Sequence, residues 1–372
     1  MIELDKTVVK KAQEMIGQAK RIVILTHMAP DGDAMGSALA LYHYLTAEGG
    51  LTGAAGLTSN SAAVSVIVPN AFPAFFNWMP GASEVLVYEK ESQRCNQLLT
   101  EADLFLCTDF NEPKRIGAVG EKMLQNPAPK ILWDHHILSI QNSYPKGTIV
   151  SDVRSQTWYD VLFSFPEACS SCEIVYNYLK STEYRIQSTD LASCLYTGLM
   201  TDTGNFSFNS TSCELYEIIA DLIRAGAKKD EIYNAVFNQY STDRVRLTGY
   251  ALYRKMRIYP EAHLALITLS ADELDQFHYQ VGDTEGLVNM PLQIADVYYS
   301  VYMREERPKP GTPKPRIRIS FRSQGDRPVN VWANEVFHGG GHMNASGGEL
   351  FGSLNQAVQL FEKTYKNYLK SE

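Results

Sequence analysis

A histidine and two aspartates lie close together near the start of the sequence. His27, Asp31 and Asp33 fall within seven residues, in the segment HMAPDGD. Imidazole and carboxylate ligands together suit Mn²⁺, Fe, Co or Zn, and carboxylates also suit Mg²⁺. Gly32 would let the backbone bend so that both carboxylates point at one spot. A solvated turn is the competing interpretation, because Asp and Gly also favour turns.

Three further polar positions favour a shared metal site over a turn. Asp109 and the run Asp134-His135-His136 each follow an apolar segment of strand length, and Asp202 follows a predicted helix. Adjacent imidazoles rarely help packing, so a purely structural role is a poor account of the two histidines. Six candidate ligands result, enough for two ions if one carboxylate bridges: His27, Asp31, Asp33, Asp109, His135 and Asp202.

These side chains need a scaffold that brings them together, and the sequence predicts an α/β fold. Residues 21–25 (RIVIL) form an apolar run of strand length, and a polar loop and a helical pattern over 34–45 follow it. Such strand–loop–helix units are typical of a parallel α/β sheet. Further strands are predicted over 84–88, 103–108 and 130–133. Ligands of parallel sheets bind at the carboxyl ends of strands, where these polar residues cluster.

The rest of the chain predicts a helical region followed by a second, smaller α/β domain. Helices are predicted over 172–180, 189–200, 212–225, 229–239 and 243–257, the last as a connector. Strands are predicted over 263–269, 296–303 and 316–322, followed by a glycine-rich loop and a helix over 354–369. The proline-rich segment 307–316 indicates an exposed hairpin tip. We therefore expect a catalytic domain over 1–240, a helical linker over 241–259 and a substrate-binding domain over 260–372.

Composition narrows the class of protein. At about 150 residues per domain, 372 residues predict two domains, and 45% hydrophobic with 20% charged residues is ordinary globular usage. The net charge of −8 argues against a long nucleic acid as partner, although a small phosphorylated ligand needs only one or two arginines. Six cysteines predict a reducing cytoplasm. We find no apolar run of membrane-spanning length and no leader pattern, so we expect no membrane partner.

The order and spacing of these motifs resemble those of the DHH phosphoesterase superfamily. Its signature series is His-x3-Asp-x-Asp, a lone Asp, Asp-His-His, and an Asp in a T-D-T-G context. The segment GGGHMNASGG at 339–348 is similar to the GGGHxxAAG loop of the DHH-associated C-terminal domain. The likeness runs from about residue 20 to 350. The segments GLMTDTGNF, SCEIVYNYL, EGLVNMP and RISFRS look most like the subfamily of nanoRNases and 3′-phosphoadenosine 5′-phosphate phosphatases.

This resemblance implies two divalent metal ions, with Mn²⁺ expected, on the first domain. His27 and Asp31 would hold one ion, Asp33, His135 and Asp202 the other, and Asp109 would bridge them. Two ions about 3.5–4 Å apart can generate hydroxide and stabilise both the attacking and the leaving oxygen. The catalytic residues would be Asp134, which orients a histidine, and His136, which reaches the phosphate or the leaving oxygen.

A phosphate clamp is expected on the second domain. Residues 304–327 hold eight Arg or Lys and only three acidic residues, and Arg318 and Arg322 share one face of a predicted strand. A solvated strand face would look the same, but arginine is well suited to phosphate and glycine N–H groups can approach it closely. The expected substrate-binding residues, in the cleft between the domains, are Arg318, Arg322, Ser323, Gly339, Gly340, Gly341 and His342.

The sequence departs from the family pattern in a few places. Segment 147–166 is longer than usual, which would suit a lid or a dimer contact. His338 and Ser346 stand where the family has a small residue and an alanine. The lone Cys169-Ser-Ser-Cys172 motif lacks two further zinc ligands, so it is interpreted as structural. Tyr298, Tyr299 and Tyr302 are expected to pack in a strand, with a base-stacking platform as the alternative.

The leading hypothesis is a metal-dependent phosphoesterase. It would release mononucleotides from short oligoribonucleotides and remove phosphate from 3′-phosphoadenosine 5′-phosphate. The alternatives are an exopolyphosphatase or pyrophosphatase-like phosphohydrolase, which shares the first-domain motifs, and a phosphodiesterase of linear or cyclic dinucleotides. A non-enzymatic nucleotide-binding module is disfavoured because every ligand position is filled. The sequence leaves open which substrate is preferred and whether the protein is a homodimer.

Overall fold

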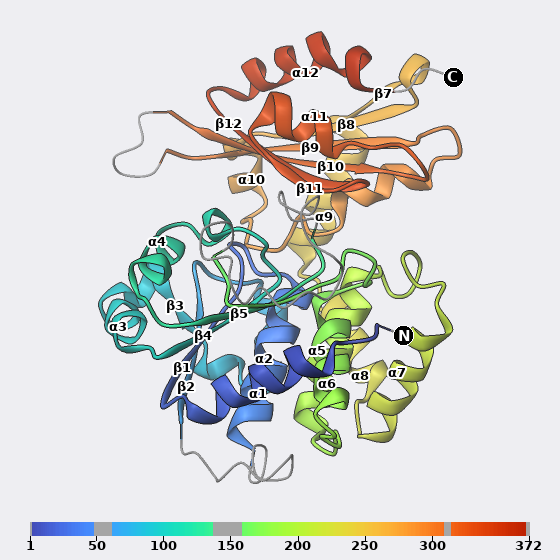
Figure 1. Ribbon diagram of the computed structural model, residues 1–372. Helices are drawn as coiled ribbons and strands as arrows, with labels where there is room; N and C mark the ends of the chain where they lie inside the picture. The colour runs from blue at the N-terminus through green and yellow to red at the C-terminus, as the bar shows by residue number, and fades with distance from the viewer. Residues whose placement is uncertain (1, 48–61, 137–157, 309–313, 370–372) are drawn as a thin grey trace. The chain divides into compact units, whose positions relative to one another are not determined.

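The strands of the first half of the chain form one sheet in which all neighbours are parallel (Figure 1). The computed structural model describes residues 2–47, 62–136, 158–308 and 314–369. The six strands are β1 (Arg21–Leu25), β2 (Ala63–Val68), β3 (Leu86–Val87), β4 (Leu104–Thr108), β5 (Lys130–Asp134) and β6 (Val161–Ser164). Every residue of β4 and β5 is buried, as expected for central strands covered on both faces.

Helices cover this sheet on both sides. They are α1 (Lys6–Gln18), α2 (Gly32–Thr46), α3 (Tyr88–Glu101), α4 (Ala118–Gln125), α5 (Ser171–Ser181), α6 (Thr189–Asp202), α7 (Cys213–Arg224) and α8 (Lys229–Phe237). Ile24 and Trp133 of the sheet share a core with α1, α2, α5 and α6. Val23 and Phe105 point the other way and pack with α3 and α4. The alternation of strand side chains thus assigns each helix group to one face.

The strand order decides where the sheet can bind a ligand. Across the sheet the order is β3-β2-β1-β4-β5-β6, so the chain leaves β1 in one direction and returns to build outwards from β4. The strand order therefore reverses between β1 and β4. In open α/β sheets, ligands bind at the carboxyl ends of the strands at such a point. His27 follows β1 and Asp109 follows β4.

The second half of the chain forms another six-stranded sheet, in which only β8 and β9 are parallel. Its strands are β7 (Met256–Tyr259), β8 (Leu264–Leu269), β9 (Tyr299–Glu306), β10 (Arg316–Ser323), β11 (Gly340–His342) and β12 (Ala345–Phe351), ordered β11-β12-β10-β9-β8-β7. Its helices are α9 (Thr242–Tyr250), α10 (Ala271–Gln276), α11 (Asn330–Phe337) and α12 (Leu354–Tyr368). Phe321, Trp332 and Phe361 form the centre of its core. The chain divides into two compact units, Met1–Gln239 and Tyr240–Glu372.

The α/β class is confirmed, with a parallel sheet in the first unit and a smaller α/β second unit. The helix predicted over 243–257 is wrong at its end. Helix α9 stops at Tyr250, a π-helical turn spans Ala251–Lys255, and β7 begins at Met256. The residues RKM favour a helix by propensity, but pairing with β8 makes the last of them the start of a strand.

The prediction of a glycine-rich loop after α11 is also wrong, because the segment forms a β-hairpin of β11 and β12. Strand β11 pairs with β12, and β12 pairs with β10. Glycine has low strand propensity, so only this pairing reveals the strands. Strand β6 lies in the segment predicted as a lid or dimer contact, of which residues 147–157 lie outside the described residues. Among the described helices, none is long and apolar enough to cross a membrane.

Candidate metal centre

His27 is held in a fixed orientation just beyond the end of β1. Its Nδ1 donates to the carbonyl of Met28 at 2.9 Å, while the Met28 N–H donates to the carbonyl of Arg115 at 3.0 Å. The opposite ring nitrogen, Nε2, therefore faces the carboxylates. It lies 3.2 Å from Asp109 Oδ2 and 3.7 Å from Asp31 Oδ2.

Asp31 and Asp33 are both positioned by the start of a helix. Asp31 is the N-cap of α2, and its Oδ1 accepts from the N–H groups of Asp33 at 3.1 Å and Ala34 at 3.0 Å. Its Oδ2 remains directed at His27. Asp33 in turn accepts from the first residues of α5, Ser171 N–H at 2.6 Å and Cys172 N–H at 2.9 Å. The positive end of α5 thus stabilises the Asp33 carboxylate.

Gly32 acts differently from the sequence expectation. It begins α2 and is absent from the glycines with positive φ, so it does not supply an unusual bend. A Cβ at this position would lie 2.3 Å from Thr201 Oγ1 of α6. The glycine therefore allows α2 and α6 to approach closely. That approach places Asp31 and Asp33 at the start of α2 near Asp202, the last residue of α6.

Asp109 lies at the centre of the candidate site. It directly follows β4 with a left-handed φ of 62°, a conformation that aspartate tolerates better than most residues. Its Oδ2 faces His27 Nε2 at 3.2 Å, and its Oδ1 faces His135 Nε2 at 3.4 Å. The Ser171 hydroxyl also donates to Oδ1 at 3.0 Å. The two oxygens of one buried carboxylate therefore face two different imidazoles.

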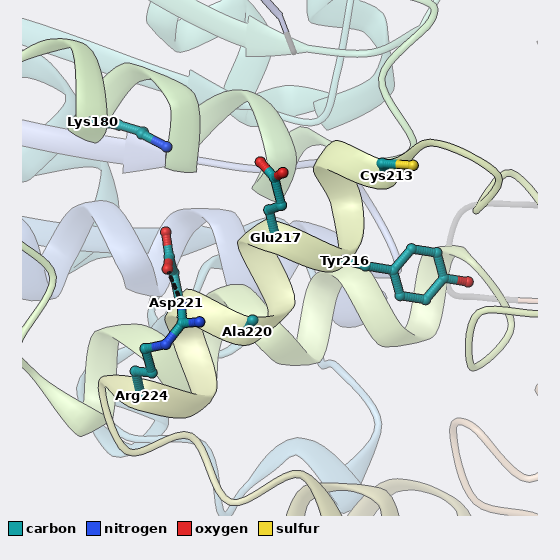
Figure 2. Close-up of a pocket in the computed structure, with 7 residues that line it drawn as sticks. All are labelled: Lys180, Cys213, Tyr216, Glu217, Ala220, Asp221 and Arg224. Atoms are coloured by element: carbon teal, nitrogen blue, oxygen red, sulfur yellow. Dashed lines mark hydrogen bonds and ion pairs between the residues drawn. The ribbon is translucent and has the colours of Figure 1, made fainter.

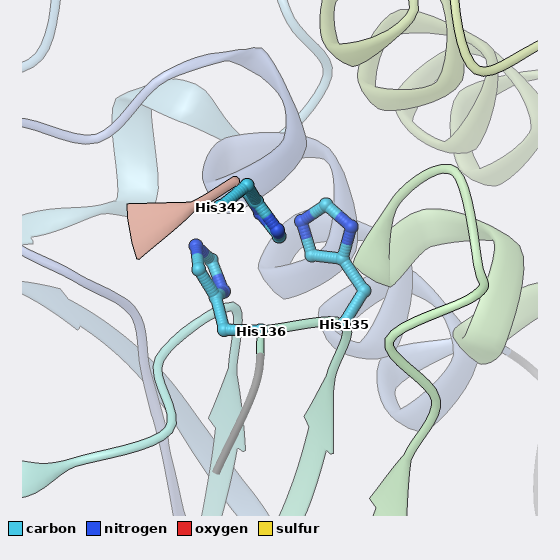
Figure 3. Close-up of side chains that lie close together, drawn as sticks. All are labelled: His135, His136 and His342. Atoms are coloured by element: carbon cyan, nitrogen blue, oxygen red, sulfur yellow. The ribbon is translucent and has the colours of Figure 1, made fainter. Parts of the chain in front are cut away.

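The Asp-His-His run places its three side chains in different settings at the end of β5. Figure 3 shows the rings of His135 and His136, whose centroids are 4.9 Å apart with planes at 74°. His135 Nε2 lies 3.4 Å from Asp202 Oδ2 and 3.8 Å from Asp33 Oδ2. Asp134 is fully buried and accepts from the Nδ1 of His136 at 2.8 Å and from its backbone N–H at 3.0 Å.

The structure brings together all six predicted ligands. Potential ligand atoms lie within 4.8 Å of one another in the group His27, Asp31 and Asp109, and again in the group Asp33, His135 and Asp202. Each group offers one imidazole nitrogen and two carboxylate oxygens, a donor set that suits a divalent transition-metal ion. Asp109 belongs to the first group and its other oxygen faces the second. Metal binding by these residues stays a prediction.

The buried histidines and aspartates of the candidate site strongly shift one another's pKa values. Burial disfavours the charged form of His27, but hydrogen bonds to Asp109 and Asp31 overcome that effect and raise its pKa to about 10. Burial and the nearby Asp109 carboxylate raise the pKa of Asp33 to about 7, and the same causes raise that of Asp134 to about 7. Burial opposes ionisation of Asp109 too, yet His135 and His27 lower its pKa. Such clustered shifts are typical of functional sites.

The predicted phosphate-binding residues of the second unit are arranged around β10. Arg318 and Arg322 lie on one face of the strand, alternating with buried Ile319 and Phe321 on the other. Ser323 is placed differently from them. Its hydroxyl donates to the carbonyl of Arg327 and accepts from Asn344 Nδ2 at 2.9 Å, so it is already bonded within the unit. A substrate-binding role for Ser323 stays a prediction.

The three glycines before His342 have different structural needs. A Cβ on Gly339 would lie 1.8 Å from the carbonyl oxygen of Gly347, and Gly341 has a φ of 138°. Gly340 has open space around it. Packing therefore requires two of the glycines, while the third leaves the backbone uncovered. The departures from the family pattern are accommodated: His338 ends α11 with φ 51°, and the Ser346 hydroxyl donates to the His342 carbonyl at 2.8 Å.

A separate pocket of about 470 Å³ lies on α5 and α7 (Figure 2). Its Asp221 accepts from Tyr176 Oη at 2.6 Å and pairs with Arg224 at 2.5 Å, so its charge is already compensated. None of the predicted site residues lines this pocket.

Sequence reasoning missed the residues that orient the ligands. Ser171, the N–H of Cys172 and the carbonyl of Arg115 all act on the site across long sequence separations. A local signal did exist for the first two. Ser170 followed by Glu173 is an N-cap pattern, and Ser170 does cap α5. The pattern marks the start of a helix, but it cannot show which carboxylate that helix meets.

Comparison with known proteins agrees with this geometry. Residues 21–199 match the family described as "DHH family, N-terminal domain". A crystal structure of an exopolyphosphatase-related protein from Bacteroides fragilis is 38% identical, covers 99% of this chain and 98% of its own, and superimposes with a TM-score of 0.82. The chain therefore belongs to the DHH family of phosphoesterases. It is a metal-dependent hydrolase.

Two curated relatives carry more specific names. The bifunctional oligoribonuclease and PAP phosphatase NrnA of Bacillus subtilis is 24% identical over 69% of this chain and 72% of its own length. The protein of the same name from Thermus thermophilus is 26% identical over 91% of this chain and 87% of its own. These names describe the relatives.

Proposed function

We propose that this protein hydrolyses short oligoribonucleotides to mononucleotides and removes phosphate from 3′-phosphoadenosine 5′-phosphate. The observation that carries the proposal is the pair of ligand groups that Asp109 joins, Oδ2 facing His27 and Oδ1 facing His135. This arrangement suits phosphoryl transfer, in which attacking and leaving oxygens are stabilised together. The names of the Bacillus and Thermus relatives support the choice of substrate.

The donor set fits two divalent ions, and we propose Mn²⁺ because imidazole and carboxylate are mixed. Such ions polarise phosphoryl oxygens and make hydroxide available near neutral pH. His27 and Asp31 would hold one ion, Asp33, His135 and Asp202 the other, with Asp109 shared. The protein's own contribution is orientation: the Met28 carbonyl fixes the ring of His27, and the start of α5 fixes Asp33 and Asp109.

Asp134 and His136 form the proposed catalytic pair. The Asp134 carboxylate accepts from His136 Nδ1 and so fixes the orientation of the ring, and we propose that Nε2 is the atom that meets substrate. When the ring carries both protons, Nε2–H can donate to a phosphoryl oxygen or to the leaving oxygen. Asp134 thus acts through His136, as a positioning residue.

In the second unit, Arg318, Arg322, the glycine N–H groups and His342 would bind substrate phosphate. Arginine offers planar donors that match phosphate, and the uncovered backbone at Gly340 allows a close approach. All six cysteines are unpaired, which supports a reducing compartment and hence our proposal of a cytoplasmic protein.

One alternative has a specific observation behind it. The solved relative from Bacteroides fragilis is titled exopolyphosphatase-related, at higher identity than the two curated relatives described above. A polyphosphate chain would use the same metal centre. The two functions differ in whether the substrate carries a nucleoside.

A substrate panel separates these proposals. The Mn²⁺-loaded protein is given a short oligoribonucleotide, 3′-phosphoadenosine 5′-phosphate and inorganic polyphosphate, and products are identified by chromatography. We expect mononucleotides from the first and adenosine monophosphate from the second. Turnover of polyphosphate alone would overturn the proposed function in favour of the alternative. Asp230→Asn is the matched control for Asp→Asn variants of the predicted metal ligands, because Asp230 lies on the exposed side of α8 and should not affect turnover.

A further inference from the structure

Three planar groups lie against one another at one end of the second sheet. The rings of His263 and Tyr298 are 4.7 Å apart with planes at 26°. The guanidinium carbon of Arg327 lies 4.3 Å from the centre of the Tyr298 ring. Both groups are therefore in contact with the same ring. Tyr298 therefore joins the other two groups into one cluster, which we call the Tyr298 column (His263, Tyr298 and Arg327).

Hydrogen bonds fix the column in place. Tyr298 N–H donates to the His263 carbonyl at 2.8 Å, and His263 Nδ1 donates to the Asp296 carbonyl at 3.0 Å. Arg327 Nη1 donates to the Gln324 carbonyl at 3.5 Å. His263, Tyr298 and Arg327 are each half-buried. The column is thus an ordered cluster whose three members are each partly accessible.

The column is directly connected to the predicted phosphate-binding residues of the same unit. Gln324, two residues after Arg322, donates its N–H to the Tyr298 carbonyl at 3.1 Å and so extends the pairing of β9 with β10. The Ser323 hydroxyl donates to the Arg327 carbonyl. Two residues of extended chain span only about 7 Å. The backbones of Arg322 and Tyr298 are therefore near neighbours in the sheet, at a separation that one nucleotide can span. Arg322 Nη1 itself donates to the Phe321 carbonyl at 2.9 Å.

Asn344 links the column to the hairpin that carries His342. Its Nδ2 donates to Ser323 Oγ at 2.9 Å and to the Gly325 carbonyl at 2.8 Å. The turn between β11 and β12 is thereby tied to the loop that contains Arg327. Ser323 thus has a structural role in this hydrogen-bond network that does not require contact with substrate.

We propose that a nucleobase of the substrate stacks on the Tyr298 column while its phosphate meets Arg322. This inference rests on the proposed function and deepens it, because it makes the nucleoside part of what is recognised. Every base has a π-face, and stacking on arginine or aromatic groups is tolerant of sequence. Arginine makes its hydrogen bonds in the guanidinium plane, so they do not compete with stacking on its face. Inorganic polyphosphate has no ring to occupy this surface.

Kinetics on matched substrates test the proposal. KM and kcat of the Mn²⁺-loaded protein are measured for a diribonucleotide and for two analogues, each lacking one of the two bases. Loss of one stacked base costs roughly 5- to 150-fold in affinity. We expect one abasic analogue to show a KM raised by that factor. Arg327→Ala should raise KM for the complete dinucleotide similarly and leave that analogue unchanged.

Variants separate stacking from charge and from folding. Arg327→Phe keeps a planar surface without charge and should restore KM, whereas Arg327→Lys keeps the charge and should not. Arg254→Ala is the matched control, because Arg254 also lies over a tyrosine of this unit, Tyr253, at 5.1 Å. It should leave every KM unchanged. Rescue by Arg327→Lys but not by Arg327→Phe would overturn stacking.

A spectroscopic measurement gives a readout independent of turnover. A non-hydrolysable dinucleotide carrying 2-aminopurine is titrated with the Mn²⁺-loaded protein, since stacking quenches the fluorescence of this base. Quenching should be lost in Arg327→Ala and kept in Arg254→Ala. Cleavage of the complete and both abasic dinucleotides with one KM would overturn the column while the proposed function stands. Failure to cleave any dinucleotide would overturn both.

Discussion

Asp109 is the residue on which the candidate centre depends most. Its two oxygens face imidazoles from two ligand groups, so its loss removes a donor from both. We expect Asp109→Asn to lower metal content and to reduce turnover by several orders of magnitude. Asparagine is a better test than alanine, because it tolerates the left-handed φ of 62° at this position. Metal analysis and initial rates check this; near-normal rates at saturating metal would contradict it.

Ser171 tests whether orientation of the ligands matters as well as their number. Its hydroxyl donates to Asp109 Oδ1 at 3.0 Å, while its backbone N–H holds Asp33 and survives substitution. Ser171→Ala should weaken metal affinity by roughly 10- to 100-fold, the usual effect of losing a partner of a ligand. Excess metal should restore the rate.

The control for Ser171 lies on the same helix. Ser181 is the last residue of α5, and its hydroxyl donates to the Asn177 carbonyl at 2.7 Å, which is a purely local bond. Ser181→Ala should leave metal titration curves unchanged. Equal curves for the two variants would remove Ser171 from the site.

The sequence could predict those site residues that directly follow a strand, because their place in the chain also fixes their place in the sheet. Asp109 and His135 follow strands, and the ends of parallel strands meet at one edge of a sheet. Ser171 could not be predicted as a partner of Asp109, because 62 residues separate them and no local pattern encodes the contact.

At the scale of elements, the packing of α2, α5 and α6 decides the geometry of the centre. Gly198 of α6 lies where a Cβ would approach Cys172 Sγ to 2.2 Å and Asp33 Oδ1 to 2.8 Å. Gly198→Ala must push these helices apart. We expect it to destabilise the fold by about 1–3 kcal/mol. It should also weaken metal binding, because Asp33 is displaced.

Gly249 of α9 provides the contrast for that experiment. Nothing lies within 4 Å of a Cβ built there. Gly249→Ala should therefore be neutral or stabilising by up to about 1 kcal/mol, since alanine is the better helix former. Denaturant unfolding of both variants measures the difference. A Gly198→Ala variant as stable as Gly249→Ala would show that close helix approach is not needed.

Strands with a clear apolar pattern could be predicted from the sequence. Strands that form only because a neighbouring strand pairs with them could not. Strands β1, β4 and β5 are continuous apolar runs and could be predicted from the sequence. The hairpin of β11 and β12 contains the residues GGH and ASGGELF, which have little strand propensity. Its strands exist because β12 pairs with β10 over seven residue pairs.

For the whole molecule, the charged centre links stability to pH. A group whose pKa is raised on folding holds its proton more tightly in the folded protein. Its contribution to the free energy of unfolding is therefore lost as pH rises. The contributions of Asp33 and Asp134 are lost between about pH 4 and pH 7, and that of His27 between about pH 6.5 and pH 10. The lowered pKa of Asp109 acts only in acid, below its ordinary value of 3.8.

The metal-free protein should therefore become less stable between pH 5.5 and 9, by on the order of a few kcal/mol. Divalent ions prefer the same groups deprotonated, so their stabilising effect should grow over that range. Melting temperatures with Mn²⁺ and with chelator should accordingly diverge as pH rises. Asp33→Asn, which cannot ionise, should flatten the curve of the chelated protein. An equal gap between the two melting curves at both pH values would mean that no proton is displaced by metal, and the buried groups would then not be its ligands.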